Sequence, residues 1–226
     1  MMQRVGLLVA VEIETVLEQM GRFLAQEQQA GFTVYEYSFC GAELFVIHSG
    51  CGELAAAAAT QLLISCYKVD LVVNFGVVGG LTPQMALLKC CVVRSVVHYD
   101  IDTSPVDRCE VGRYLEYPTV YIPTTASLVE QALQVEPTLQ PVICASGDKF
   151  IADPGKKAAL FEQYQAEICE MEAAGIVLTC NRCGVPCLLI KAVSDSITGG
   201  AEEFVQALEQ ASALCLRVTA KVLKAL

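Results

Sequence analysis

Short apolar runs rich in β-branched residues recur along the chain, separated by longer segments of helical composition. The runs predict buried strands at residues 5–11, 44–48, 71–75, 90–97, 142–145 and 186–193. The segments between them predict helices at residues 53–66, 125–134, 155–163, 172–183 and 202–226. Strands that alternate with helices predict an α/β fold, with three α/β/α layers around a mainly parallel central sheet.

Two further patterns refine this architecture. The runs at 33–39 and 43–48 flank the short segment Cys40-Gly41-Ala42, which predicts a hairpin and therefore a mixed sheet. The helix at 172–183 is expected to end at Gly184, with Pro186 opening the next strand. No linker, repeat or low-complexity tract interrupts the chain, so we expect one domain over residues 1–226.

The composition narrows the class of protein. Hydrophobic residues make up 54% of the chain and the mean hydropathy is +0.48, but no window supplies the ~18 uninterrupted apolar residues of a membrane span. The first apolar run meets Glu12 and Glu14 at once and lacks a cleavage pattern, unlike a signal peptide. With 25 Asp and Glu against 15 Lys and Arg, the charge balance argues against a nucleic-acid partner.

Cysteine usage indicates a reducing, cytoplasmic environment. Five of the twelve cysteines lie inside apolar runs, where a free thiol behaves as a small hydrophobe: Cys90, Cys91, Cys144, Cys187 and Cys215. Cys180, Cys183 and Cys187 have a spacing that suits a metal, but no fourth ligand lies nearby in the sequence. We therefore expect buried thiols, no metal site and no cofactor.

Because ligands bind at the carboxyl ends of strands in such sheets, the residues that follow each run are the candidate site. These are Glu12 and Glu14, the segments 49–52, 76–80, 146–150 and 170–172, and the pair Ser194-Asp195. The glycine-rich segment 74–81 lacks the spacing of a phosphate-binding loop, and it is interpreted either as a turn that lets the backbone approach a ligand or as a structural turn.

Three carboxylates, Glu14, Glu172 and Asp195, are expected to meet at this edge. Cleavage of a glycosidic bond would suit such a set, with one carboxyl group that donates a proton, one that accepts a proton and one that binds hydroxyls. The residues alone leave simpler roles open, since a Glu near a helix start interacts with the helix dipole and an Asp can cap a helix.

Six segments make the sequence similar to the nucleoside phosphorylase/nucleosidase superfamily, and most similar to the 5′-methylthioadenosine/S-adenosylhomocysteine nucleosidases. They are residues 5–14 (VGLLVAVEIE), 48–57 (HSGCGELAAA), 74–81 (NFGVVGGL), 146–151 (SGDKFI), 170–176 (EMEAAGI) and 185–195 (VPCLLIKAVSD). The resemblance covers nearly the whole chain and implies hydrolysis of a 5′-modified adenosine.

The resemblance also implies residue roles. Asp195, held by Ser194, resembles the acid that protonates N7 of the purine, and Glu14 resembles the base that deprotonates the attacking water. Glu172 resembles the carboxylate that binds the ribose hydroxyls, with Met171 packed on the sugar. The other substrate-contacting positions that it implies are Phe150 and Ile151 at the base, Val77, Val78 and Gly79 in the glycine-rich segment, Cys51 and Lys191.

Some positions differ from the family pattern. Phosphorylases of the superfamily place an Arg where this chain has Asn74, so water is the expected nucleophile; a phosphate-dependent phosphorylase is the alternative. Val77 stands where the nucleosidases have Ser, Lys191 stands where they have Arg, and the segment 195–204 is short. These differences leave open a different 5′ substituent, a weak enzyme, or a protein that only binds purine nucleosides.

The family is commonly dimeric, with a loop of the partner closing the 5′ end of the pocket. The irregular segment 99–114 is the candidate for that loop. The expected partners are therefore a small-molecule nucleoside and a second copy of this chain.

Overall fold

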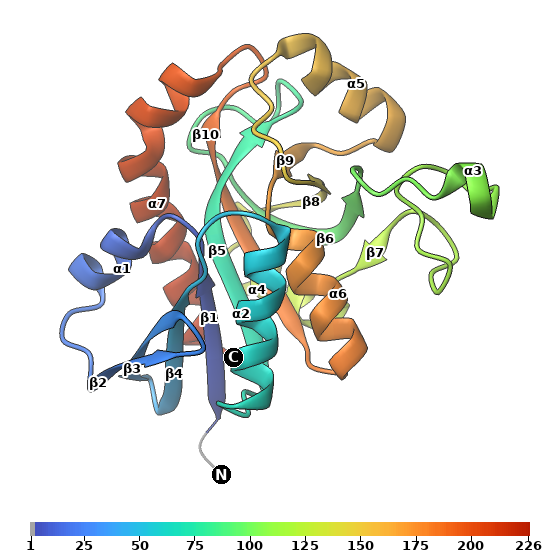
Figure 1. Cartoon of the computed structure of the whole chain (residues 1–226). Coiled ribbons are helices and arrows are strands. Elements are labelled where there is room, and N and C mark those ends of the chain that lie inside the picture. Colours follow the sequence, from blue (N-terminus) through green and yellow to red (C-terminus); the bar gives the residue numbers. More distant parts are fainter. Residues whose placement is uncertain (1–2) are drawn as a thin grey trace.

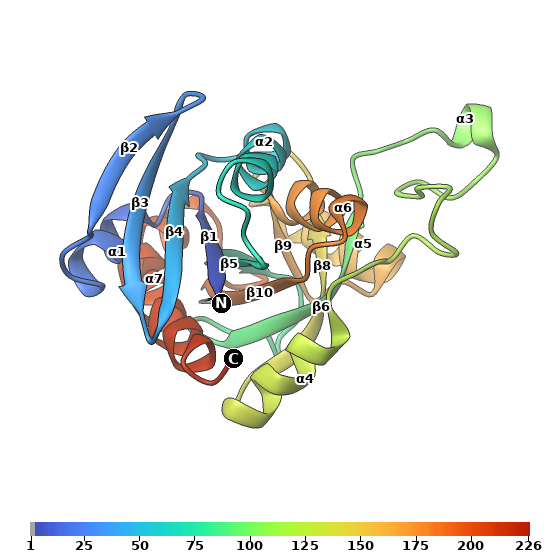
Figure 2. The same cartoon turned by 90° about the horizontal axis from the view of Figure 1, so that it is seen from below.

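The computed structural model describes residues 3–226, and Figures 1 and 2 show its elements. The strands are β1 (Arg4–Val9), β2 (Ala25–Gln29), β3 (Phe32–Phe39), β4 (Ala42–His48), β5 (Leu71–Gly80), β6 (Cys90–His98), β7 (Ile122–Pro123), β8 (Gln140–Ser146), β9 (Ile168–Glu170) and β10 (Cys187–Asp195). The helices are α1 (Ile13–Gln19), α2 (Glu53–Ser65), α3 (Ser104–Asp107), α4 (Ala126–Val135), α5 (Pro154–Tyr164), α6 (Ala173–Cys183) and α7 (Ala201–Leu223).

The strands of residues 3–226 form one ten-stranded mixed sheet. β1 lies between β4 and β5 and is parallel to both, and β5 is also parallel to β10. The pairs β10–β6, β6–β8, β8–β9 and β9–β5 continue from there, so five strands close into a ring. The β3–β4 pair is the antiparallel hairpin that the sequence predicts.

Helices cover both faces of the sheet, which confirms the predicted α/β fold (Figures 1 and 2). One buried cluster joins the sheet to α2 and α6 through side chains such as Leu63 and Val177. A second cluster joins the opposite face to α1, α4 and α7 through Val16, Ala132 and Cys215. Since both faces are covered, β10 is buried along its whole length and its sequence is almost continuously apolar.

The structure corrects the interpretation of the glycine-rich segment 74–81. Residues 74–80 are not a turn but the second half of β5, and none of their glycines has a positive φ. The glycines instead leave room for neighbouring groups that pack closely against the backbone of β5. A Cβ on Gly80 would lie 2.2 Å from the Met85 carbonyl oxygen, and one on Gly76 would lie 3.0 Å from Glu12 Oε1.

Five elements have no counterpart in the predicted pattern: β2, β7, β9, α1 and α3. β2 is a polar edge strand (AQEQQ) with every residue exposed, so no hydrophobic alternation marks it. The other helices and strands lie close to their predicted ranges, and α6 ends at Gly184 with φ +67°.

The cysteines are all free thiols in the structure. Cys90, Cys91, Cys144, Cys187 and Cys215 are buried, as predicted. Within residues 3–226, every helix is too short or too polar to span a bilayer, and no three metal-binding side chains are grouped as a metal site would need.

Candidate active site

A pocket of about 600 Å³ opens at the carboxyl ends of β1, β5 and β10, a size typical of small-molecule sites. Its wall consists of residues 10–12, 77–79, 149–151, 169–172 and 194–195, together with Cys51 and Phe204. The pocket thus brings together Asp195, Glu172, Met171, Phe150, Ile151, Ser194, Val77, Val78, Gly79 and Cys51 of the predicted site. Two predicted residues, Glu14 and Lys191, are not part of its wall.

Asp195 is the last residue of β10 and is 2% exposed. Its Oδ1 accepts a hydrogen bond from Ser194 Oγ at 3.1 Å, and its Oδ2 accepts one from Lys157 Nζ at 2.6 Å. Burial raises the pKa of Asp195, and the Lys157 ammonium acts against that rise. A carboxyl in this environment can carry a proton and release it to a ligand.

The carboxylate that β1 supplies to the pocket is Glu12, not Glu14. β1 ends at Val9, the chain bends, and Glu12 stands at the N-cap position of α1. Glu12 is 4% exposed, and its two oxygens accept hydrogen bonds from Val77 N at 2.8 Å and Val11 N at 3.0 Å. Glu14 lies in the first turn of α1 with its side chain in solvent. Glu14, which the resemblance implied as the base, therefore does not face the pocket.

Glu172 is the N-cap residue of α6 and lines the same pocket. Its Oε1 accepts a hydrogen bond from Gly52 N at 2.9 Å. Burial, followed by the nearby charge of Glu170, raises the pKa of Glu172 to about 7. Beside it, Met171 Sδ lies 3.6 Å from Cys51 Sγ. Glu172 and Met171 therefore offer a carboxylate and an apolar surface side by side.

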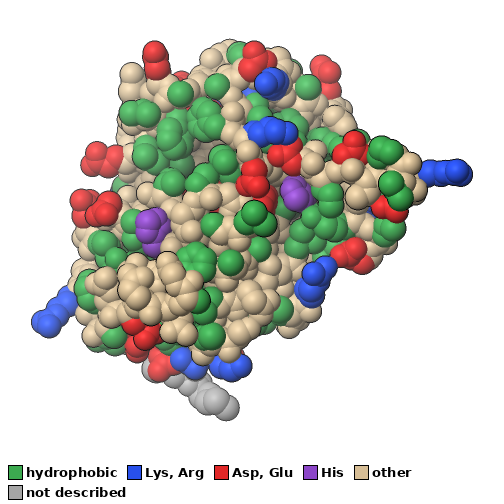
Figure 3. Space-filling view, viewed as in Figure 1, with side chains coloured by type: hydrophobic (Ala, Val, Ile, Leu, Met, Phe, Trp, Pro, Cys, Tyr) green, Lys and Arg blue, Asp and Glu red, His purple; other side chains and the backbone are tan. Residues whose placement is uncertain are grey.

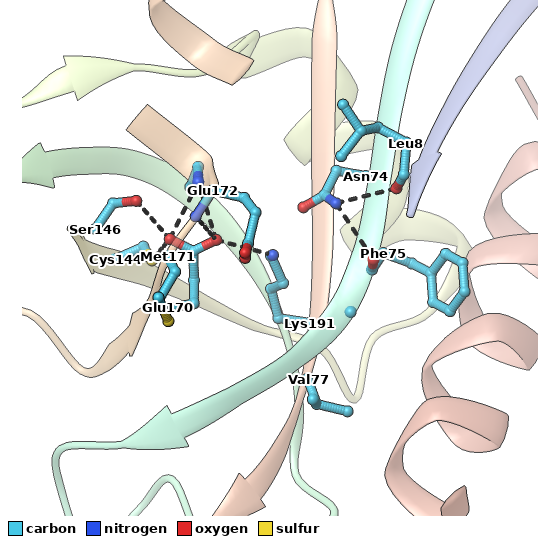
Figure 4. Close-up of polar contacts among 12 residues, drawn as sticks. Leu8, Asn74, Phe75, Val77, Cys144, Ser146, Glu170, Met171, Glu172 and Lys191 are labelled. Atoms are coloured by element: carbon cyan, nitrogen blue, oxygen red, sulfur yellow. Dashed lines mark hydrogen bonds and ion pairs between the residues drawn. The ribbon is translucent and has the colours of Figure 1, made fainter. Parts of the chain in front are cut away.

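Glu170 lies beside Glu172, and groups of the protein itself bind its carboxylate oxygens (Figure 4). Its Oε2 accepts hydrogen bonds from Glu172 N at 3.1 Å and Ala173 N at 2.9 Å, at the start of α6, and from Lys191 Nζ at 3.1 Å. Lys191 is 1% exposed. The structure therefore corrects the expectation that Lys191 contacts substrate: its ammonium pairs with Glu170 because that buried carboxylate needs a counter-charge.

The hydrogen bonds around Ser146 Oγ indicate that Glu53, the first residue of α2, carries a proton. Ser146 Oγ lies within hydrogen-bond distance of both Glu53 and Glu170 Oε1, and it also accepts the Ala174 N–H at 3.1 Å. A hydroxyl has one hydrogen to donate, so one of the two carboxyls must donate to it. Burial and the charge of Glu170 raise the pKa of Glu53 to about 8, which makes Glu53 the protonated partner.

An aromatic wall closes the far end of the pocket. Phe150 is 46% exposed and packs edge-to-face on Phe204, with the ring centroids 5.4 Å apart. Phe204 lies on α7, whereas Phe150 and the buried Ile151 directly precede α5. A flat heterocycle would fit between such a wall and the strand ends.

Asn74 is a structural residue of β5. Its side chain is 1% exposed, and Nδ2 donates to the carbonyl oxygens of Leu8 at 3.1 Å and Phe75 at 3.3 Å (Figure 4). The amide thus ties β5 to β1 and is not part of the pocket wall.

The sequence profile described as "Phosphorylase superfamily" matches residues 4–224. The chain belongs to this superfamily. A relative from Shewanella sp. (strain W3-18-1), named 5′-methylthioadenosine/S-adenosylhomocysteine nucleosidase, is 32% identical over 201 residues, which cover 85% of this chain and 86% of the relative. A relative of the same name from Shewanella halifaxensis is 32% identical over 173 residues, 74% of each chain.

Solved structures of superfamily members match along the whole chain. The 5′-methylthioadenosine/S-adenosylhomocysteine nucleosidase of Helicobacter pylori, in complex with a pyrrolidine-based ligand, has a TM-score of 0.93 and 25% identity, covering 99% of each chain. A futalosine hydrolase mutant from the same species has a TM-score of 0.93 and 26% identity, covering 99% of this chain and 100% of that one. The protein is accordingly a nucleosidase, an enzyme that hydrolyses N-glycosidic bonds.

Sequence reasoning did not assign three residues of this superfamily member's site: Glu12, Lys157 and Phe204. Glu12 was among the candidates after the first strand, but nothing in the sequence marks the bend before it. Lys157 did carry a signal. Its spacing places it on the same face of α5 as the buried Leu160 and Tyr164. A lysine on a buried helix face needs a partner for its charge, which indicates an acidic group nearby.

Proposed function

We propose that this nucleosidase hydrolyses the N-glycosidic bond of a 5′-substituted adenosine of the 5′-methylthioadenosine/S-adenosylhomocysteine type. The observation that carries the proposal is the meeting of Asp195, Glu12 and Glu172 around one pocket that also has an aromatic wall. The names of the Shewanella relatives support the substrate class. Futalosine, which the name of one structural neighbour suggests, is the second candidate substrate.

Each carboxyl has a separate task in the proposed reaction. Asp195 donates its proton to N7, so that the purine leaves as a neutral base when the bond from C1′ to N9 breaks. Glu12 takes a proton from the water that attacks C1′, and the two backbone amides that bind its oxygens fix its orientation. Glu172 accepts hydrogen bonds from the ribose hydroxyls and stabilises the positive charge that develops on the sugar ring.

The charges around the pocket support water over phosphate as the nucleophile. Four carboxyl residues line it, Glu12, Glu170, Glu172 and Asp195, whereas Lys149 is the one cationic residue of its wall within residues 3–226. Lys149 pairs with Asp100 and has a side chain that is 62% exposed. Because a phosphate dianion needs several fixed donors, this wall disfavours it.

The decisive experiment measures release of free base from 5′-methylthioadenosine, S-adenosylhomocysteine, adenosine and futalosine, each with and without phosphate. We expect adenine from the first two without phosphate, and a loss of kcat of about 10²–10⁴-fold in Asp195→Asn. The control is Glu130→Gln, the same change from carboxyl to amide at an exposed residue of α4 outside the pocket wall. Release that requires phosphate would show a phosphorylase, and release from futalosine alone would change the assigned substrate.

We also propose that the enzyme is a homodimer that uses the face of α2 and α6. This face carries a groove lined by Leu54, Ala57, Leu178 and neighbouring residues, and Leu54 is 84% exposed. The segment that contains α3 projects beyond α6 (Figures 1 and 2), and hydrophobic side chains gather between α6 and this segment in Figure 3. A second copy of the chain would cover this apolar surface.

The free thiols also support the proposed cytoplasmic location.

Light scattering after gel filtration tests the dimer. The wild type should have twice the chain mass, and Leu54→Glu should give monomers with the same circular dichroism, because a charge at the centre of the face opposes association. A change at an exposed residue outside the groove, Val205→Glu on α7, is the matched control. A monomeric wild type at micromolar concentration would contradict the proposal.

A further inference from the structure

Lys157 is a fully buried lysine whose ammonium group ends at the proposed acid. It has 0% exposure and reaches from α5 to Asp195 Oδ2 at 2.6 Å. The same Nζ lies 2.5 Å from the carbonyl oxygen of Ser196 and 3.2 Å from that of Gly199. An ammonium has three hydrogens to donate, and these three acceptors match them one to one. The geometry is therefore that of a fully satisfied lysine cation.

The turn that follows β10 is folded around this ammonium. Ser196 N donates to Glu203 Oε2 at 2.6 Å, and Gly199 N donates to the Ser196 carbonyl oxygen at 3.0 Å. The turn leads into α7, which carries Phe204 of the aromatic wall. Lys157 thus joins three parts of the site: the acid, the turn behind it and the helix that follows Phe150.

We propose that Lys157 is a positioning residue for proton donation: it fixes one oxygen of Asp195, holds the 196–199 turn, and stabilises the carboxylate that remains once the proton has moved to the purine. The inference rests on the proposed role of Asp195 as the acid. In that step the carboxyl proton goes to N7, the electron pair of the C1′–N9 bond goes to the base, and the negative charge left on Asp195 faces a preoriented cation.

Lys157 is the group near Asp195 that counteracts the effect of burial on the pKa of this carboxyl. Burial raises the pKa of the carboxyl and would leave a weak acid. The charged or titratable groups facing Asp195 are Lys157 from α5, Glu203 from α7 and Cys169 from β9. Glu203 raises the pKa further, whereas Lys157 lowers it. Removing the ammonium should therefore make Asp195 hold its proton to higher pH.

The test compares Lys157→Met with Lys156→Met, a neighbouring lysine that is exposed on the same helix. Lys157→Met should lower kcat by about 10²-fold with little change in KM, because Lys157 does not touch the substrate. The alkaline limb of kcat/KM, which follows the acid in the free enzyme, should move up by about one to three pH units. Lys156→Met should match the wild type in all three quantities.

A second readout does not depend on turnover. Carbon-13 NMR of the aspartate carboxyls, with Asp195→Asn to assign the signal, follows the titration of Asp195 in the empty protein. We expect its midpoint to rise in Lys157→Met; an unchanged midpoint overturns the inference. If the wild type releases no base, the proposed function fails, while this titration still tests the pair.

The conservative variants keep the test decisive if Lys157→Met does not fold. Lys157→Gln should raise the midpoint of Asp195, and Lys157→Arg, which keeps the charge, should restore it towards the wild-type value. Equal midpoints in these two variants would overturn the inference as well.

Discussion

Replacing Glu53 by Gln removes a carboxyl that the folded protein holds protonated, and it should change how stability depends on pH. The amide keeps the shape of the carboxyl, with an N–H group to donate to Ser146 Oγ and an oxygen to accept the Gly175 N–H. The variant therefore preserves the contacts between α2 and α6 and removes only the titration.

The pKa of Glu53 sets the size and sign of the effect. Burial first, and then the charge of Glu170, raises it from 4.5 to about 8. Between these values the folded state binds a proton that the unfolded state has lost, so the free energy of unfolding falls as pH rises. At about 1.4 kcal/mol per pH unit, the difference corresponds to about 5 kcal/mol, present in full below the unfolded pKa and lost by about pH 8.

Urea unfolding followed by circular dichroism measures this directly, and the chain has no Trp for fluorescence. From about pH 5 to about pH 9 the wild type should lose several kcal/mol more than Glu53→Gln does. Glu172 titrates in both proteins, and its charge also raises the pKa of Glu53, so the difference between the two proteins reports Glu53 together with this interaction. Glu130→Gln, an exposed change on α4, should follow the wild type. If the free energy of unfolding depends on pH in the same way in the wild type and in Glu53→Gln, Glu53 is not the protonated partner of Ser146.

Three further predictions concern the site and its support. Glu12→Gln should lower kcat by about 10²–10⁴-fold while Glu14→Gln keeps wild-type activity, and the reverse result would contradict the placement of the base. Because the pKa of Glu172 is raised to about 7, kcat/KM should rise with pH up to neutrality, and Glu172→Gln should lack this acidic limb; a limb that persists would assign it elsewhere. Gly175→Ala should destabilise the fold by about 1–3 kcal/mol in thermal or urea unfolding, because its Cβ would lie 2.4 Å from the Glu53 carbonyl oxygen; unchanged stability would argue against this close packing.

The sequence predicted most of the elements because apolar periodicity records burial, and both faces of this sheet are buried. It also located the strand-to-helix junction at Glu172 and the strand end at Asp195, where the pocket lies. Hydrophobic periodicity does not reveal an element that buries few side chains. β2 is an exposed polar strand, and α1 is a seven-residue helix in which only Ile13 and Val16 are buried.

The errors in the site have a common physical cause: side-chain direction depends on backbone bends and tertiary contacts that spacing does not record. Glu12 and Glu14 follow the same strand, but the bend after Val9 turns Glu12 to the pocket and Glu14 to solvent. Lys191 lies in β10 close to Asp195, yet its ammonium turns to Glu170. The glycines of β5 suggested a turn because sequence alone does not distinguish a need for positive φ from a need for space.

The two buried lysines explain how the pocket keeps an inner wall that is rich in carboxyl groups. Lys157 pairs with Asp195 and Lys191 pairs with Glu170, and neither lysine lines the pocket. Backbone amides serve Glu12 and Glu172 in the same way, so the carboxyl groups face inward while their positive or dipolar partners lie behind them. Such a wall stabilises a sugar that becomes positively charged and repels an incoming phosphate. The placement of the counter-charges, more than the number of carboxylates, therefore favours a hydrolase over a phosphorylase.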